Sequence, residues 1–439
     1  MKKEFKIAIV GLGQIGIFLY NELKRNQKTI QLLTGKKIKI VGLSARNKNK
    51  KRRYPINKKI FFKDPIKMLK SKQVDILFEC IGLSDGMSKR CVEFALNRKI
   101  HVITPNKALI SKHGDKLSSI AENKRVNLEF EASVGGGIPI LRTIKDSLAT
   151  NHITKVYGIL NGTCNYILSE MEKTKDNFKN VLIKAQKLGY AEPGNPKLDL
   201  NGYDALAKVK ILSALAFNKR LSNSVSLMEG IENVEPKDFE IADQLNLRIK
   251  LLGITEIINN KLFERVHPCL VKKNTYIGNV GGVMNAVILE GKPVGESVLQ
   301  GEGAGPEPTS SALMSDLMSI LRGNIKYPFG IPNSKRNKIK SYDLNNYENS
   351  LYIRFEVKDK QGVLSQITKN LANNNISVQR LIQIPNNKNK TASIVIITHA
   401  TKQINSDKNK VLVKDKKALF DDVKDKDELN IIIKSDVQG

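Results

Sequence analysis

The sequence predicts an α/β protein in which a doubly wound parallel sheet is followed by an α+β domain and a small βαββαβ unit. The first observation is an apolar run, residues 5–10, that leads directly into the glycine loop GLGQIG and then into a helical pattern. The second is that further apolar runs alternate with helical segments, as in a parallel sheet with helices on both faces. These runs are residues 37–46, 74–82 and 101–107. The third is a separate strand and helix pattern after residue 350, in a chain whose 439 residues suffice for two or three domains.

Composition narrows the class of protein. No stretch approaches 18 uncharged apolar residues, so we expect no membrane span, and the apolar N-terminus enters a glycine loop as a first strand rather than as a signal peptide. The net charge of +30 raises nucleic-acid binding as an alternative, but its lysines are mixed with Asn and Ile along the whole chain, as in 47–53 and 386–390. We therefore expect no nucleic-acid partner. The scattered cysteines fit a reducing cytoplasm; they are Cys80, Cys91, Cys164 and Cys269.

The glycine loop has the spacing of a dinucleotide-binding turn. Gly11, Gly13 and Gly16 form GxGxxG, with Gln14 and Ile15 between the last two, and they separate a strand from a helix. The first glycine permits the turn, the second lets a pyrophosphate approach the backbone, and the third lets the helix pack on the strand. The pattern predicts a Rossmann-type cofactor domain; a tight turn without a ligand is the alternative.

The end of the second strand bears on the choice of nucleotide. It carries Ser44 and Arg46, without the acidic residue that commonly binds the ribose hydroxyls of NAD. An arginine suits the 2′-phosphate of NADP, so we expect NADP rather than NAD. The alternative is an ordinary solvated arginine.

Three further motifs follow. Lys107, in TPNKA, lies at the carboxyl end of a predicted strand, where functional loops of such sheets lie, although a solvated lysine is the alternative. The glycines at 135–137 form a turn that can bind an ion or admit another segment. GILNGTCNYIL reads as a second strand, turn and helix, with Asn161 or Thr163 capping the helix.

The stretch after Leu188 carries the chemistry. Residues 189–203 are a polar loop holding Glu192 and Asp199, and a helix should begin near Asn201. On that helix Asp204 and Lys208 are four residues apart, which places them on one face. A carboxylate beside an ammonium can hold the amine and tune its proton affinity, as a general acid or base requires. A surface ion pair is the alternative.

The remaining chain is placed more coarsely. Residues 220–300 mix short strand and helix patterns, and 299–321 read as a glycine turn followed by an amphipathic helix that offers a second surface for a phosphate or nicotinamide. We expect a cofactor domain at 1–132, to which the helix 305–323 returns, a substrate and dimerisation domain at 133–304, a linker at 324–349 and a C-terminal domain at 350–434. The elements expected in that domain are strands at 351–357, 376–384, 392–399 and 429–434, and helices at 363–374 and near 408–423, with a DKQG turn at 359–362.

Taken in this order, the motifs resemble the homoserine dehydrogenases, in the form with a C-terminal ACT domain. The motifs that carry the resemblance are GLGQIG (11–16), TPNKA (104–108), EASVGGGIPI (131–140), GILNGTCNYIL (158–168), LGYAEPGNPKLDLNGYDALAK (188–208), GEGAGPEPTSSA (301–312) and DKQGVLSQI (359–367). The resemblance implies reversible NAD(P)-dependent oxidation of L-homoserine to L-aspartate 4-semialdehyde, in the biosynthesis of threonine, methionine and isoleucine.

The resemblance also implies roles for single residues. In the family, the lysine matching Lys208 exchanges the substrate hydroxyl proton, the aspartate matching Asp204 supports it, and the lysine matching Lys107 lies by the nicotinamide. The glutamate matching Glu192 binds the substrate amino group. Positions matching Gly162, Thr163, Tyr190 and Asp199 line the substrate pocket, those matching Thr104 and Gly303 belong to the cofactor site, and those matching Glu131, Val134, Gly136 and Ile138 form a monovalent-cation site, usually for sodium.

The chain departs from the family pattern in three places. PGNPKLD carries one extra residue near Asn195, Glu302 stands where the family has Arg, and Gln361 stands where the family often has Pro. The resemblance implies a homodimer or homotetramer and a possible L-threonine effector. Two other readings stay open: another ACT-tailed dehydrogenase such as a prephenate dehydrogenase, which would need a catalytic His, and a non-enzymatic amino-acid sensor.

Overall fold

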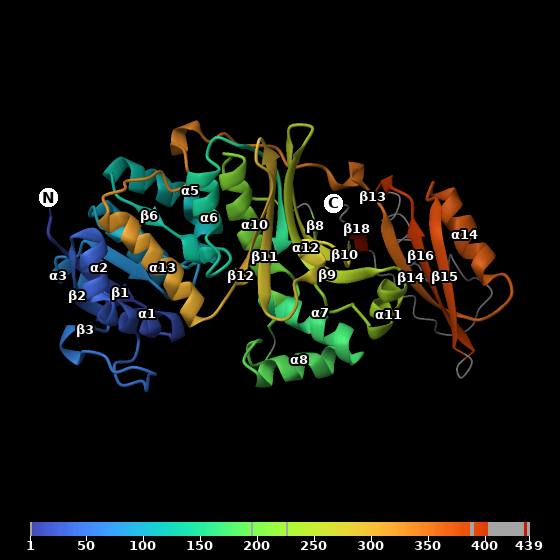
Figure 1. The fold of residues 1–439 in the computed structure, drawn as a ribbon, viewed down its shortest axis with the longest axis horizontal. Coiled ribbons are helices and arrows are strands. Elements are labelled where there is room, and N and C mark those ends of the chain that lie inside the picture. Colours follow the sequence, from blue (N-terminus) through green and yellow to red (C-terminus); the bar gives the residue numbers. More distant parts are fainter. Residues whose placement is uncertain (1, 195, 225–226, 387–389, 403–433, 437–439) are drawn as a thin grey trace.

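The computed structural model describes residues 2–194, 196–224, 227–386, 390–402 and 434–436. Along the long axis of the molecule a helix-wrapped sheet comes first, a second sheet lies in the middle, and a small sheet with one helix lies at the far end (Figure 1). Among the described helices, none combines the length and apolar character that a membrane crossing requires.

The first sheet is parallel, as the sequence predicts. Its spatial order is β3(Phe61–Phe62), β2(Lys37–Ser44), β1(Glu4–Val10), β4(Ile76–Glu79), β5(His101–Ile103) and β6(Leu128–Glu129). The strand order reverses direction between β1 and β4, so the segments that follow these two strands lead away in opposite directions. Doubly wound sheets bind their ligands in the crevice outside the carboxyl ends of the strands at such a point.

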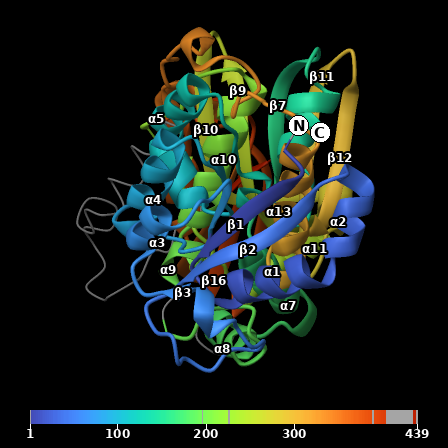
Figure 2. The ribbon, with the colours of Figure 1, turned by 90° about the vertical axis from the view of Figure 1, so that its left-hand side faces the viewer.

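Helices cover both faces of this sheet (Figure 2). One face carries α1(Gln14–Arg25), α2(Gln27–Thr34) and α13(Pro306–Leu321). The other carries α3(Pro65–Ser71), α4(Met87–Asn97) and α5(Lys107–Lys124). Helix α13 comes from the far part of the sequence, and its Leu313 and Leu317 are fully buried in the same apolar cluster as Leu19 and Leu23 of α1.

Two strands of the first sheet, β2 and β5, end before their apolar runs do. The run 37–46 ends as a strand at Ser44, and the run 101–107 ends at Ile103. Pro105 cannot donate to a strand ladder, and the Asn106 side chain accepts a hydrogen bond from Leu109 N, which caps a helix. Lys107 is therefore the first residue of α5 and not part of a strand.

Most of the strands in the second sheet come from residues 220–300, to which the sequence pattern assigned no definite elements. Its strands are, in spatial order, β12(Gly295–Glu302), β11(Met284–Lys292), β7(His152–Ile159), β9(Leu247–Ile258) and β10(Lys261–Lys272), with β8(Leu227–Met228) beside β10. Asn259 and Asn260 both adopt positive φ angles, which is how a two-residue hairpin turn follows the twist of its strands.

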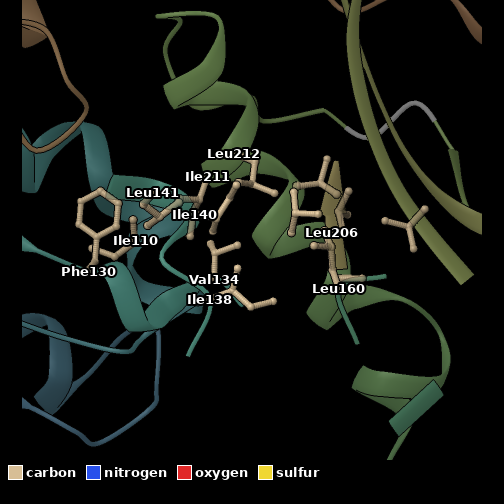
Figure 3. Close-up of a cluster of buried hydrophobic side chains, with 14 of the residues drawn as sticks. Ile110, Phe130, Val134, Ile138, Ile140, Leu141, Leu160, Leu206, Ile211 and Leu212 are labelled. Atoms are coloured by element: carbon tan, nitrogen blue, oxygen red, sulfur yellow. The ribbon is translucent and has the colours of Figure 1, made fainter. Parts of the chain in front are cut away.

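Helix α10 joins the two sheets. The helices of this region are α6(Ile140–Arg142), α7(Gly162–Thr174), α8(Phe178–Lys187), α9(Lys197–Leu200), α10(Tyr203–Ala216), α11(Pro236–Gln244) and α12(Tyr276–Asn279). Figure 3 shows Leu206, Ile211 and Leu212 of α10 beside Leu160 on one side and Ile140 on the other. Because α10 is apolar nearly all round, it is buried on all sides rather than lying on a surface.

The polar stretch at 324–349 is not a loose connection. Phe329 is fully buried, and the buried Arg336 guanidinium stacks over its ring at 3.9 Å. Tyr342 and Tyr347 pack on Phe263 of β10 with ring centroids 5.2 and 4.6 Å apart. These four side chains pack the segment against the rest of the protein. They are too far apart in the sequence to form a periodic apolar pattern.

The C-terminal region shows a strand, helix, strand, strand order, as predicted. Its elements are β13(Glu348–Asn349), β14(Leu351–Lys358), α14(Val363–Asn373), β15(Val378–Asn386), β16(Thr391–Thr398) and β17(Thr401–Lys402). The helix expected near 408–423 lies outside the described residues, as does the strand expected at 429–434 apart from its last residue. That residue begins β18(Lys434–Asp436), which pairs with β10 on one side and β14 on the other, so the small sheet extends the second one.

Candidate active site

Asp204 lies at the centre of the candidate active site, between two lysines. Its Oδ1 is 2.7 Å from Lys107 Nζ, and its Oδ2 is 2.7 Å from Lys208 Nζ. Lys208 also donates to the Leu160 carbonyl oxygen at 2.6 Å. The side chains of Asp204 and Lys208 are each only 8% exposed, which rules out the surface ion pair that their spacing alone could have meant.

Two helices bring these groups together. Lys107 is the first residue of α5, beside the carboxyl end of the first sheet, whereas Asp204 and Lys208 lie one turn apart on α10. Gly202 precedes α10 with φ of +86°, and a Cβ there would meet Val266 at 3.0 Å. The helix begins close to Asn201, as expected, but the preceding loop is not wholly irregular because it contains the short helix α9.

The surroundings shift the proton affinities of the two lysines in opposite directions. Burial lowers the pKa of Lys208 below its ordinary value, although Asp204 opposes the shift. Burial also acts to lower the pKa of Lys107, but the nearby carboxylates, Asp204 first, outweigh it and raise that pKa. Burial favours protonation of Asp204, yet the two ammonium groups hold its pKa below the ordinary range. Paired groups with diverging pKa values are typical of acid–base sites.

Asn161 connects Asp204 to a second carboxylate. Its Nδ2 donates to Asp204 Oδ2 at 2.9 Å and to Asp199 Oδ1 at 2.8 Å. Its Oδ1 accepts from Cys164 N at 2.8 Å and so caps α7, which confirms one of the two capping residues suggested by the sequence. No local pattern predicts the two carboxylate contacts, because Asp199 and Asp204 are 38 and 43 residues away from Asn161 in the sequence.

The remaining substrate candidates surround this core. Thr163 Oγ1 donates to the Tyr190 carbonyl oxygen at 2.6 Å, and the Tyr190 ring lies 4.8 Å from that of Tyr166. Glu192 is exposed, and its carboxylate is one of the groups that raise the pKa of Lys107. A Cβ at Gly162 would lie 2.7 Å from the Val283 carbonyl oxygen. Any side chain at this position would therefore push away the backbone just before β11.

The glycine loop has the shape that a dinucleotide needs. A Cβ on Gly11 would meet the Cys80 carbonyl oxygen at 2.3 Å, and one on Gly16 would meet the Gly11 carbonyl oxygen at 1.9 Å. Nothing lies within 4 Å of the corresponding position on Gly13, which leaves open space over the start of α1, where Gln14 and Ile15 follow. An open glycine before a helix N-terminus fits a pyrophosphate.

A basic loop shares this space. A cavity of about 490 Å³ is lined by Leu12, Gly13, Gln14, Ile17, Phe18, Lys50, Lys51, Arg52, Arg53 and Pro306. Arg46 is exposed just after β2 and does not line this cavity. The lysine and arginine run at 50–53 looked like compositional bias in the sequence. The signal that it could face a phosphate is its position in the segment that follows β2, the strand beside β1 and its glycine loop.

Thr104 and Gly303 are the other two residues that the resemblance assigns to the cofactor site. Thr104 is fully buried, and its hydroxyl donates to Glu79 Oε2 at 2.7 Å. Gly303 packs so closely on Asn285 that a Cβ would lie 2.1 Å from its Nδ2. Glu79, which the sequence did not single out, is a fully buried carboxylate that also accepts from Ile81 N and Asn106 Nδ2, and it thereby holds the segment that leads to Lys107.

The proposed cation segment is tightly folded. The Glu131 carboxylate accepts from Leu141 N and Arg142 N, and Ile138 N donates to the Gly135 carbonyl oxygen. Val134 is fully buried, and Gly136, with φ of +54°, presses against Gly303. Within the part of the chain that the structure describes, no group of three or more His, Cys, Asp or Glu side chains could hold a metal ion.

Comparisons with known proteins agree over almost the whole length. The family model described as "Homoserine dehydrogenase, NAD binding domain" matches residues 11–131, and "Homoserine dehydrogenase" matches residues 139–318. A homoserine dehydrogenase of Neisseria gonorrhoeae is 36% identical, over 91% of this chain and 92% of its own, and one of Helicobacter pylori is 38% identical, over 92% and 94%.

Solved structures show the same likeness. The crystal structure of a homoserine dehydrogenase from Thiobacillus denitrificans superposes with a TM-score of 0.86 at 31% identity, covering 99% of each chain. A hyperthermophilic archaeal homoserine dehydrogenase, solved in complex with NADPH, shares the fold with a TM-score of 0.59 at 21% identity, over 72% of this chain and 97% of its own.

Proposed function

Since the chain belongs to the homoserine dehydrogenase family, we propose from its geometry how its side chains carry out that family's reaction. The chain is an NAD(P)-dependent oxidoreductase of amino-acid biosynthesis with homoserine dehydrogenase activity. Its substrates are then L-homoserine and L-aspartate 4-semialdehyde. The observation that carries the mechanism is the Asp204 carboxylate, shared by one lysine from each side of the crevice.

Lys208 is the group that exchanges the hydroxyl proton. When bound, the nicotinamide accepts the hydride from the substrate carbon. The hydroxyl proton must leave at the same time, and the lowered pKa of Lys208 makes its neutral amine available as the base. Asp204 holds that amine in place, while Lys107 stays protonated and stabilises the negative charge that develops on the substrate oxygen.

Replacing Lys208 tests the base. Lys208→Ala should lower kcat for homoserine oxidation by about 10²–10⁴-fold, and Lys208→Arg should fail as well, because arginine does not lose its proton near neutral pH. In the wild type, kcat/KM for oxidation should rise with pH as Lys208 deprotonates and reach a plateau below the pH at which an ordinary lysine titrates. Lys210→Ala, on the same helix, is the control. Near-normal turnover in Lys208→Ala would contradict the assignment.

Glu192 is the proposed contact for the substrate ammonium. Its carboxylate is exposed at the edge of the site, so it can reach a ligand without losing a protein partner that the structure depends on. Gln186 Nε2 donates to the carbonyl oxygens of Glu192 and Gly194, at 3.1 and 2.9 Å, and holds this loop on α8. Asp199 and the segment from Gly162 to Thr163 complete the pocket from the side of α7.

Glu192→Gln separates binding from chemistry. The change removes the negative charge but keeps the size, so the KM for homoserine should rise by more than kcat falls. Steady-state kinetics at saturating cofactor measures both constants. A collapse of kcat at unchanged KM would show that Glu192 acts on the reacting centre instead.

We propose NADP as the preferred nucleotide. Arg46 and the basic loop 50–53 both follow β2, and that loop lines the cavity beside Gly13 and Gln14. Arg53 is braced by Glu307 at 3.3 Å and by the rings of Phe18 and Tyr54, which keeps the loop against α1. A guanidinium or ammonium in this position suits the extra phosphate of NADP.

Paired substitutions test this preference. Arg46→Ala and Lys51→Ala should each weaken NADP binding more than NAD binding, by about 1–3 kcal/mol for a lost charged hydrogen bond. Calorimetric titration with each nucleotide measures the difference, and turnover with each is recorded beside it. Lys28→Ala removes an exposed lysine of the same domain and is the control. Equal losses for both nucleotides would refute phosphate recognition.

The cation, the assembly and the compartment are further proposals. Backbone oxygens around Glu131, Val134, Gly136 and Ile138 are the proposed ligands of a sodium ion, which would fix the turn that Gly303 packs against. The chain is proposed to form a homodimer or homotetramer through the second sheet, in which β12 is an edge strand among the residues that the structure describes. The scattered placement of the four cysteines along the sequence supports a cytoplasmic location.

The C-terminal region is proposed to be an ACT domain that senses L-threonine. A buried cluster ties it to the catalytic part: Arg354 of β14 lies 3.1 Å from Asp238 and 2.9 Å from Glu235, at the start of α11. Just before α11, Ile231 N donates to the Leu200 carbonyl oxygen. A change in the C-terminal sheet can therefore reach the segment that carries Asp199 and leads into α10, by a coupling free energy of typically 1–3 kcal/mol.

Truncation tests the sensor. The structure puts the cut between Asn349 and Ser350, because Tyr342 and Tyr347 pack on the catalytic part. Full-length protein should lose activity with millimolar threonine, and the shortened protein should not. In the full-length chain, Glu235→Gln should reduce the response while leaving activity without threonine intact. If full-length and shortened forms respond alike, the C-terminal region is not the sensor.

A further inference from the structure

We propose that Asn161 is a positioning residue for the reaction: its amide holds Asp199 and Asp204 at a fixed separation and aims Asp204 at Lys208. The inference rests on the role proposed above for Lys208. The resemblance to the family implies no role for Asn161, and the sequence pattern predicts only that it caps a helix.

The geometry uses every hydrogen-bonding atom of the Asn161 side chain. The two Nδ2 protons serve Asp199 Oδ1 and Asp204 Oδ2, at 2.8 and 2.9 Å, and Oδ1 accepts from Cys164 N at 2.8 Å. Asn161 is 5% exposed, so solvent has little access to replace these bonds. The amide therefore links the start of α7 to α9 and α10 in one orientation only.

The two carboxylates need this donor. Burial, and then the charge of Asp204, raise the pKa of Asp199, whereas the hydrogen bond from Asn161 opposes that shift. Without the amide, one of the two would be expected to take up a proton, and Asp204 could turn away from Lys208. The ionisable groups that face this pair are Lys107, Lys208 and Cys164. Beyond them, Glu192 acts on Lys107 and Glu232 acts on Cys164.

Asparagine can do both tasks, and aspartate only one. A carboxylate at position 161 would still cap α7, since aspartate is as good a cap as asparagine. It would have no proton to donate, and it would place a third negative charge beside Asp199 and Asp204. Asn161→Asp thus removes the bridge and keeps the cap. Asn161→Ser also keeps a cap and removes the bridge without adding a charge.

The experiment measures kcat, KM and cofactor affinity of the full-length protein across pH. For both variants kcat should fall by about 10- to 100-fold, the range expected when hydrogen bonds to charged groups are lost, while NADP affinity and the circular dichroism spectrum stay unchanged. The ratio of Asn161→Asp to wild-type activity should rise as the pH is lowered, because the new carboxyl gains a proton and can donate again. A residue with only a structural role would give no such pH signature.

Asn177→Asp is the matched control. Asn177 caps α8 by accepting from Asn180 N at 3.0 Å, so the same substitution at a helix cap away from the site should leave kcat unchanged. Normal kcat in folded Asn161→Asp and Asn161→Ser would overturn the proposal. Lys208→Ala is assayed beside these variants. If it is inactive while the Asn161 variants have normal kcat, the role of Lys208 stands and only that of Asn161 is rejected.

Discussion

The structure depends on one buried carboxylate that neutralises two lysines from different parts of the fold. Asp204 contacts Lys107, which the first sheet positions, and Lys208, which the second sheet positions through α10. Breaking the buried pair of Asp204 and Lys208 by removing one partner would typically cost about 3–5 kcal/mol, because the other charge would stay buried and uncompensated. The same arrangement lets burial lower the pKa of one lysine while carboxylates raise that of the other, so stability and chemistry rest on the same contacts.

A second buried network keeps the crevice in shape. Asp316 of α13 accepts from Glu131 N at 3.0 Å and from Arg142 Nη2 at 3.1 Å, and Lys145 lies 3.3 Å from Glu129 in nearly complete burial. Burial, and then the nearby carboxylates, raise the pKa of Asp316, whereas the two cations oppose this. These bonds fasten α13 to the start of the second region. Helix α13, which is far from the first sheet in the sequence, is therefore held against that sheet by polar contacts of Asp316 as well as by apolar packing.

The packed segment at 324–349 and the Arg354 cluster make the molecule more continuous than its domain pattern suggests. The ring centroids of Phe329 and Phe130 are 5.1 Å apart, and the ring of Tyr347 packs on that of Phe263 in the second sheet. Beyond them, Arg354 is fully buried against Asp238 of α11, and β18 pairs with β10 of the second sheet and with β14 of the C-terminal region. Buried contacts therefore join the C-terminal region to the catalytic part of the molecule.

The sequence by itself determined the parallel sheet, the glycine loop and the Asp204–Lys208 turn, because each depends on residues close together in the chain. Local spacing decides which side chains share a helix face and where a strand gives way to a turn. The tertiary structure alone decided that Lys107 is the second partner of Asp204, that Asn161 bridges two carboxylates, and that the basic loop at 50–53 faces the glycine loop. These contacts join residues far apart in the sequence, and no periodic pattern records which distant segments will meet when the sheets and α10 pack around one core.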